Sequence, residues 1–197
     1  MATTPKKSLG LDTNLLLDMA GDKDFAHEFK DEFLARGYDL LVPPTVVAEF
    51  VFFEEHANLP PHRLATIALE RIIAWRCRPF SLSATELTIA VRFANRLIDS
   101  LLIPETEQND GKILAQLSLA GVPMVATSDK HLLDIEEEAL VLAFGDADLF
   151  PVHPAHPRRL LKAIRYHGNE ASSVLFPIDI PRKSLSDWPI ANLSNEL

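Results

Sequence analysis

The stretch that most constrains the fold covers residues 9–17, which read Leu-Gly-Leu-Asp-Thr-Asn-Leu-Leu-Leu. This pattern predicts a short apolar strand that ends at a carboxylate, Asp12, followed at once by the start of an apolar helix. In open α/β folds the functional groups gather at the carboxyl ends of the strands. Asp12 is therefore a candidate site residue, and other acids are sought at the ends of other predicted strands.

Beyond this stretch, the chain alternates between short apolar segments and amphipathic helical segments as far as residue 166. Such alternation is typical of an α/β fold with a largely parallel sheet. The expected strands lie at residues 9–11, 39–42, 122–126 and 149–152, with a connector or short strand at 80–82. The expected helices lie at residues 22–36, 45–53, 62–76, 83–102, 111–120 and 157–166.

Length and pattern predict one domain with an appendage. The 197 residues fit one ordinary domain, which we assign to residues 1–166. From residue 167 onward the periodicity fades and prolines interrupt it. Residues 167–197 are therefore expected to form an appendage that is extended, or packed on the domain or on a partner.

The single cysteine and the lengths of the apolar segments indicate the cellular compartment. Cys77 is the only cysteine, so no internal disulfide can form, which fits a reducing compartment. Residues 1–7 lack the apolar core of a secretory signal, and no run approaches the ~18 apolar residues of a membrane span. We expect a cytoplasmic protein without a membrane partner.

The net charge of −9 is unevenly distributed. Residues 99–148 hold eleven acids against two lysines, and this segment alone carries a net charge of −9. A solvated acidic face explains part of it, in particular Glu136, Glu137 and Glu138. A surplus of carboxylates is also typical of a cation site, because converging acids repel one another unless a cation lies between them.

Glu49 is the only charged residue between Leu40 and Phe53. Pro43 and Pro44 end the strand before it, and Thr45 is expected to cap the helix that contains it. On that helix Glu49 shares a side with apolar residues, and a buried carboxylate needs a cation or shifts its pKa. The alternatives are that Glu49 faces outward or pairs with an arginine.

Two further acids lie at predicted element ends. Asp110 opens the helix at residues 111–120, where it could serve only as a cap, and Asp129 follows the strand at 122–126. If the strands are parallel and adjacent, Asp12, Glu49, Asp110 and Asp129 converge. Such a cluster suits Mg²⁺ or Mn²⁺, and two such ions can activate water against a phosphodiester.

Other chemistries find less support in the sequence. Cys77 has no identifiable histidine partner, and the seven glycines form no phosphate-binding loop. Residues 153–156 hold two histidines, but their prolines favour a turn over a helical metal pair. A phosphotransferring aspartate enzyme of the haloacid dehalogenase type would need a second aspartate where Asn14 stands.

Taken together, four motifs resemble the PIN domain family. They are Asp12-Thr13-Asn14 after a strand, an acid in the helix after the second strand, Asn109-Asp110-Gly111-Lys112-Ile113-Leu114-Ala115, and Thr127-Ser128-Asp129-Lys130-His131-Leu132-Leu133. The order, followed by an ending from Phe150 to Leu161, is similar to PIN proteins that are toxin components of toxin–antitoxin pairs. The resemblance covers residues 7–165, and Leu132 departs from it where an aromatic residue is common.

The resemblance implies a three-layer α/β/α sandwich around a mostly parallel sheet of four or five strands. It also implies a Mg²⁺- or Mn²⁺-dependent endoribonuclease, whose metal-activated water leaves a 5′-phosphate and a 3′-hydroxyl. The implied metal-binding residues are Asp12, Glu49, Asp110 and Asp129. Asn14 would orient a ligand or water, Thr127 matches the family's hydroxyl residue, and Asp134 is either an extra acid or, as we favour, a surface residue.

The implied partners are an RNA substrate, a protein antitoxin and a second copy of the chain. The aromatic segment at residues 50–53, or Trp188 in the appendage, is a candidate dimer surface. Two rival functions remain: a catalytically weak module of the same fold that binds RNA or protein, and a metal-dependent phosphohydrolase acting on DNA or small substrates.

Overall fold

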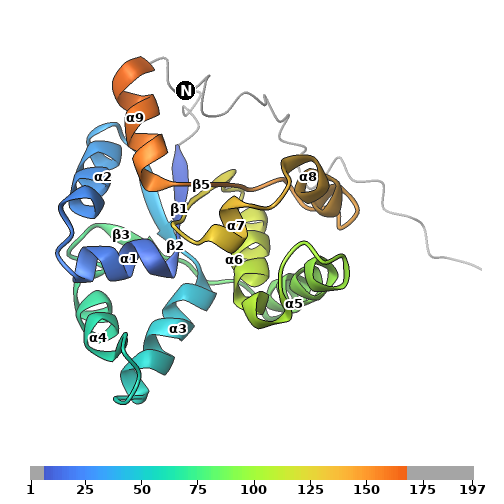
Figure 1. The fold of residues 1–197 in the computed structure, drawn as a ribbon, viewed down its shortest axis with the longest axis horizontal. Coiled ribbons are helices and arrows are strands. Elements are labelled where there is room, and N and C mark those ends of the chain that lie inside the picture. Colours follow the sequence, from blue (N-terminus) through green and yellow to red (C-terminus); the bar gives the residue numbers. More distant parts are fainter. Residues whose placement is uncertain (1–6, 168–197) are drawn as a thin grey trace, which may run out of the picture.

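The computed structural model of the chain describes residues 7–167 (Figure 1). The strands are β1 (Ser8–Leu11), β2 (Asp39–Val42), β3 (Cys77–Pro79), β4 (Met124–Ala126) and β5 (His153–Ala155). The helices are α1 (Thr13–Ala20), α2 (Asp24–Ala35), α3 (Pro44–Glu55), α4 (His62–Arg71), α5 (Ala84–Asp99), the 3₁₀ turn η1 (Glu105–Glu107), α6 (Gln108–Leu119), α7 (Lys130–Leu133), α8 (Glu137–Gly145) and α9 (Pro157–His167). The appendage and Trp188 lie outside the described residues, except for His167.

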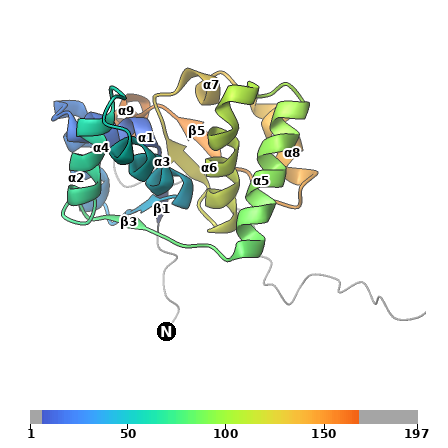
Figure 2. The same cartoon turned by 90° about the horizontal axis from the view of Figure 1, so that it is seen from below.

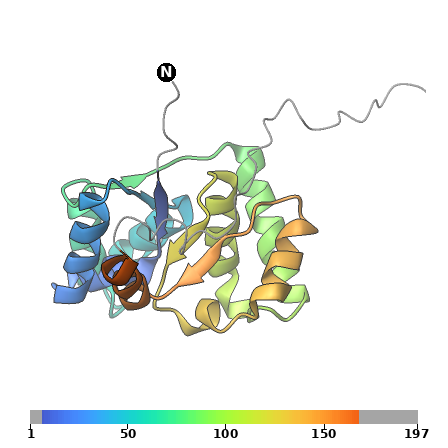
Figure 3. The same ribbon diagram turned by 90° about the horizontal axis from the view of Figure 1, so that it is seen from above.

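The strands form one all-parallel sheet in the order β3-β2-β1-β4-β5. Figures 2 and 3, which view the molecule from opposite directions, show α5 and α6 on one side of the sheet and α9 on the other. The fold is therefore an α/β/α sandwich with five parallel strands, which confirms the predicted fold class. Within residues 7–167, no helix combines the length and apolar character that a bilayer crossing requires.

The core follows the apolar periodicity of the sequence. β1, β2 and β4 each bury their last three residues, as expected for central strands covered on both faces. In α2, Phe29 and Phe33 are buried and stack at 4.4 Å between ring centroids. Phe29 and Phe33, four residues apart on one side of α2, therefore belong to the core. The aromatic segment of α3 is divided, with Phe50 buried and Phe52 half exposed.

Two glycines allow α6 to approach its neighbours closely. A Cβ at Gly10 of β1 would lie 2.5 Å from Leu117 of α6, and a Cβ at Gly111 would lie 2.7 Å from the Cα of Ala94 in α5. Such distances exclude a side chain unless a neighbour moves. Gly10 and Gly111 therefore hold α6 against β1 and α5, which sets the position of Asp110.

The N-terminal caps of α5 and α3 differ. Ser83 caps α5, and a reciprocal capping box links it to Glu86. The prediction for Thr45 was wrong, because the cap of α3 lies two residues earlier, at Pro43, which makes no side-chain hydrogen bond. The Thr45 N–H donates instead to Oε1 of Gln116 (3.1 Å), and Gln116 Nε2 donates to Thr45 Oγ1 (2.8 Å). A side chain of α6 thus caps α3.

The last strand is β5, at His153–Ala155, and not residues 149–152 as predicted. The turn expected at 153–156 was wrong for the same reason. Pro154 cannot donate a ladder hydrogen bond, but β5 pairs only with β4 and lies at the edge of the sheet, where proline is tolerated.

Other boundaries moved by a few residues. The third strand lies at Cys77–Pro79 and not at residues 80–82, because Arg76 adopts a left-handed conformation (φ 61°) that turns the chain into the sheet early. α8 was not predicted. Its N-cap is Glu136, whose side chain accepts from the Ala139 N–H, so the acidic run begins a helix.

Candidate metal-binding site

Asp12 lies at the carboxyl end of β1 and caps α1. Its N–H donates to the carbonyl of Ala126 (3.2 Å), which ties this end of β1 to β4. Its carboxylate accepts from the Thr13 N–H (2.8 Å) and from Oγ1 of Thr127 (2.7 Å). The side chain is almost fully buried, and this burial raises its pKa from 3.8 to about 6 despite both hydrogen bonds. The charges of Glu49 and Asp129 contribute to the same shift.

Asp129 follows β4 and caps α7, where its Oδ1 accepts from the His131 N–H (2.7 Å). Thr127 links it to Asp12, because the Thr127 hydroxyl donates to Asp12 and accepts from the Asp129 N–H (2.9 Å). Asn14 lies on the other side, with its Nδ2 3.5 Å from Asp129 Oδ2, at the limit of hydrogen bonding. Thr127 thus contacts two of the candidate acids and Asn14 lies beside one of them, while the ligand-orienting role expected for Asn14 stays a prediction.

Glu49 lies on α3 and is half buried. Its Oε2 accepts from the hydroxyl of Thr13, and its Oε1 accepts from Nδ2 of Asn109 (2.7 Å). Within residues 7–167, these neutral donors are its hydrogen-bond partners, and no arginine pairs with it. Glu49 is thus held toward the first turns of α1 and α6.

Asp110 is the third residue of α6 and lies in its first turn. It is therefore not the N-cap of this helix, which was the alternative considered from the sequence. It is buried, and its Oδ2 has no hydrogen-bond partner among the described residues. Its pKa is raised from 3.8 to about 8, first by burial and then by the charges of Asp12, Asp129, Glu107 and Glu49.

The raised pKa of Asp110 is consistent with the predicted acids lying near one another. Asp12, Glu49 and Asp129 come from three other elements, and each acts on Asp110 through its charge. Parallel neighbouring strands explain the convergence, because β1 and β4 end at the same edge and α3 and α6 begin beside it. Asp134 is exposed at the end of α7, in keeping with the surface role that we favoured.

Sequence reasoning missed the residues that position these acids. Thr13 and Asn109 bind Glu49, and Glu107 adds charge near Asp110. Thr13 and Asn109 stand inside the quoted motifs, each directly beside a candidate acid, but no role was predicted for them from the sequence.

The donor chemistry suits a hard divalent cation, since the candidate ligands are carboxylate oxygens and one of them is buried without a partner. Within residues 7–167, however, no three or more His, Cys, Asp or Glu side chains are arranged so that they could hold a metal ion. Both oxygens of Asp12 and both of Glu49 are engaged by donors, and like charges oppose closer approach. Among the described residues, each of these oxygens accepts only one hydrogen bond and keeps a further lone pair, so the donors could orient the acids while a cation is bound.

Cys77, the cysteine of this chain, does not have the properties of a reactive thiol. Cys77 is buried in β3, and burial raises the pKa of its thiol to about 12. A thiol with so high a pKa stays protonated near neutral pH and is a poor nucleophile.

Comparison with protein-family models and with curated proteins finds no match for this chain. The evidence for function is therefore the arrangement of the residues described above.

Proposed function

We propose that this protein is a Mg²⁺- or Mn²⁺-dependent endoribonuclease of the PIN type. The observation that carries the proposal is that Thr127 links Asp12 to Asp129 and Thr13 links Asp12 to Glu49, while Asp110 is buried with a carboxylate oxygen that has no partner among the described residues. Burial of the carboxylates of Asp12 and Asp110 destabilises the fold unless a cation compensates them. Four carboxylates brought together from separate elements therefore favour a cation site.

The four acids would hold the ion. When bound, Mg²⁺ or Mn²⁺ supplies Lewis-acid activation of water and neutralises charge on the phosphodiester. The other side chains have positioning roles: Thr127 fixes the orientation of Asp12 relative to Asp129, and Thr13 and Asn109 fix Glu49. Such positioning groups are typical of metal sites, where they tune affinity by ~10–100-fold.

A direct test is cleavage of a labelled single-stranded RNA with Mg²⁺ or Mn²⁺, with and without EDTA. Asp12→Asn keeps the size of the side chain and removes its charge, and we expect it to lower cleavage by about 100-fold or more. Asp134→Asn is the matched control, because it removes one exposed acid at the end of α7 and should leave cleavage unchanged.

Three outcomes would redirect the proposal. Cleavage that survives Asp12→Asn would place the chemistry elsewhere. RNA binding without metal-dependent cleavage would favour a binding module of the same fold. Cleavage of DNA or of small phosphodiesters in preference to RNA would favour a phosphohydrolase.

A toxin role, with a protein antitoxin as partner, is a finer form of the same proposal. Co-expression with the product of a small neighbouring reading frame should relieve growth arrest caused by the active protein. The Asp12→Asn variant should cause no arrest.

A further inference from the structure

Helix α9 concentrates positive charge on an acidic protein. It contains Arg158, Arg159, Lys162 and Arg165 and no acid, whereas the chain as a whole has a net charge of −9. Leu160, Leu161 and Ile164 are buried and fix the helix on the domain. The basic side chains are therefore displayed on the outer surface of a firmly packed helix.

Two of the four cations have local partners. Arg165 pairs with Glu28 of α2, and the guanidinium of Arg158 lies over the ring of Phe25, 4.5 Å from its centroid. Arg159 and Lys162 are exposed, and within residues 7–167 neither has a carboxylate partner. These two charges are available to a ligand.

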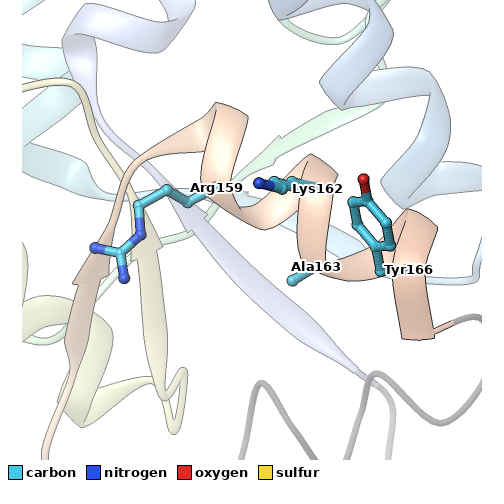
Figure 4. Close-up of a pocket in the computed structure, with 4 residues that line it drawn as sticks. All are labelled: Arg159, Lys162, Ala163 and Tyr166. Atoms are coloured by element: carbon cyan, nitrogen blue, oxygen red, sulfur yellow. The ribbon is translucent and has the colours of Figure 1, made fainter.

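Tyr166 extends the same face. Its side chain is 77% exposed, and the Lys162 ammonium lies 5.8 Å from the ring centroid. Figure 4 shows Arg159, Lys162 and Tyr166 along one stretch of α9, with Arg159 nearest to β5 and Tyr166 at the far end. Below, these three residues are called the α9 face.

The α9 face begins beside the candidate metal site. Ala155, the last residue of β5, accepts a hydrogen bond from the Thr127 N–H (3.1 Å), and the Thr127 hydroxyl binds Asp12. Helix α9 starts only two residues after Ala155. The first turn of α9 thus lies at the same sheet edge as the acids, and the face leads away from them.

We propose that the α9 face binds a single-stranded RNA segment next to the scissile phosphodiester, a proposal that rests on the nuclease function proposed above. Arg159 and Lys162 bind phosphates, and Tyr166 stacks on a base. The seven residue steps from Arg159 to Tyr166 span about 10 Å of helix, which matches about three nucleotides of stacked strand at ~3.4 Å each. Cations next to an exposed aromatic ring are the usual composition of a surface for single-stranded nucleic acid.

The α9 face also offsets the repulsion between RNA and the acidic residues of the candidate site. An RNA strand brought to a cluster of acids is repelled, and the cation at the site compensates only the phosphate at the reaction centre. Adjacent phosphates need positive charge from the protein, and the α9 face supplies it beside the acids.

The test measures binding apart from cleavage. The full chain is titrated into a fluorescently labelled single-stranded RNA of about twelve nucleotides in EDTA, and anisotropy is followed from 50 to 300 mM salt. We expect the double variant Arg159→Ala/Lys162→Ala to bind roughly tenfold more weakly, and its log–log salt slope to fall by ~1.4, since each phosphate contact on a single strand contributes ~0.7. Tyr166→Ala should weaken binding about fivefold or more with little change of slope.

The matched control is Arg92→Ala/Arg96→Ala, which removes two exposed arginines from α5, a helix on the opposite side of the sheet (Figures 2 and 3). This variant should keep the wild-type affinity. Equal weakening by both double variants would overturn the proposal in favour of unspecific charge attraction.

The remaining outcomes separate this proposal from the nuclease function. Wild-type affinity in the α9 variants, or no RNA binding by the wild type, would overturn the α9 proposal even if cleavage is observed. Tight binding of poly-glutamate through the same residues, without RNA binding, would assign the face to an acidic protein partner. Weakened RNA binding in the α9 variants supports the proposal, while absence of Mn²⁺-dependent cleavage would count only against the nuclease function.

Discussion

Asp110→Asn should stabilise the metal-free protein while abolishing the proposed nuclease activity. Asp110 is buried among three other acids, and its pKa is about 8 in the folded chain against 3.8 ordinarily. At pH 7 the unfolded carboxyl is ionised, so folding must take up a proton, which costs roughly 4 kcal/mol at 1.36 kcal/mol per pKa unit. Asparagine is neutral in both states and avoids this cost.

The realised gain will be smaller than that upper bound, because water and side-chain relaxation screen buried charges. We expect about 1–3 kcal/mol at pH 8, which corresponds to a rise in melting temperature of roughly 3–10 °C for a domain of this size. At pH 5 the proton uptake costs only roughly 2 kcal/mol, so the gain should shrink to less than half.

The assay is thermal unfolding in EDTA at pH 5 and pH 8, followed by circular dichroism. Asp134→Asn, an exposed acid, serves as the control and should change stability by less than about 0.5 kcal/mol. A gain of equal size at both pH values would refute the electrostatic reasoning, and a loss of stability at pH 8 would show that Asp110 is not repelled by its neighbours.

Three further predictions follow from the same structure. First, the metal-free protein should be less stable at pH 8 than at pH 5 because of Asp12 and Asp110, as urea titration can measure. The pKa values of both carboxyls are raised in the folded chain, which therefore binds more protons than the unfolded chain between pH 4 and pH 8. Second, Mn²⁺ binding should release protons at pH 6–7, visible as a buffer-dependent heat in calorimetry, and Asp12→Asn should reduce this release. Third, Gly111→Ala should destabilise the chain by about 1–3 kcal/mol, because the new Cβ meets the backbone of Ala94, whereas Gly145→Ala, which meets nothing within 4 Å, should not destabilise it.

Local pattern was sufficient for much of the architecture. The alternation of short apolar runs with amphipathic segments predicted an α/β fold. Ser83 and Glu86 are three residues apart, so their capping box is a local feature that sequence can reveal. The candidate acids were also found locally, because Asp12, Asp110 and Asp129 lie at predicted element ends and Glu49 is the only charge in an apolar segment.

Features that depend on contacts distant in sequence were missed. β5 contains a proline and reads as a turn, and it becomes a strand only because β4 offers its free edge. Thr45 reads as a cap, yet its N–H is satisfied by Gln116, 71 residues away. The donors that hold Glu49 come from α1 and from the start of α6, which no spacing rule connects to α3.

By itself, then, the sequence determined the residue types available at the strand ends, since apolar periodicity and hydrogen-bonding capacity are properties of neighbouring residues. Only the tertiary structure decided how those residues act on one another. Burial and the sum of charges depend on the packing of separate elements, so the raised pKa of Asp110, the engagement of Asp12 by Thr127 and the nearness of α9 to the acids arise when β1, β4, β5 and α6 come together.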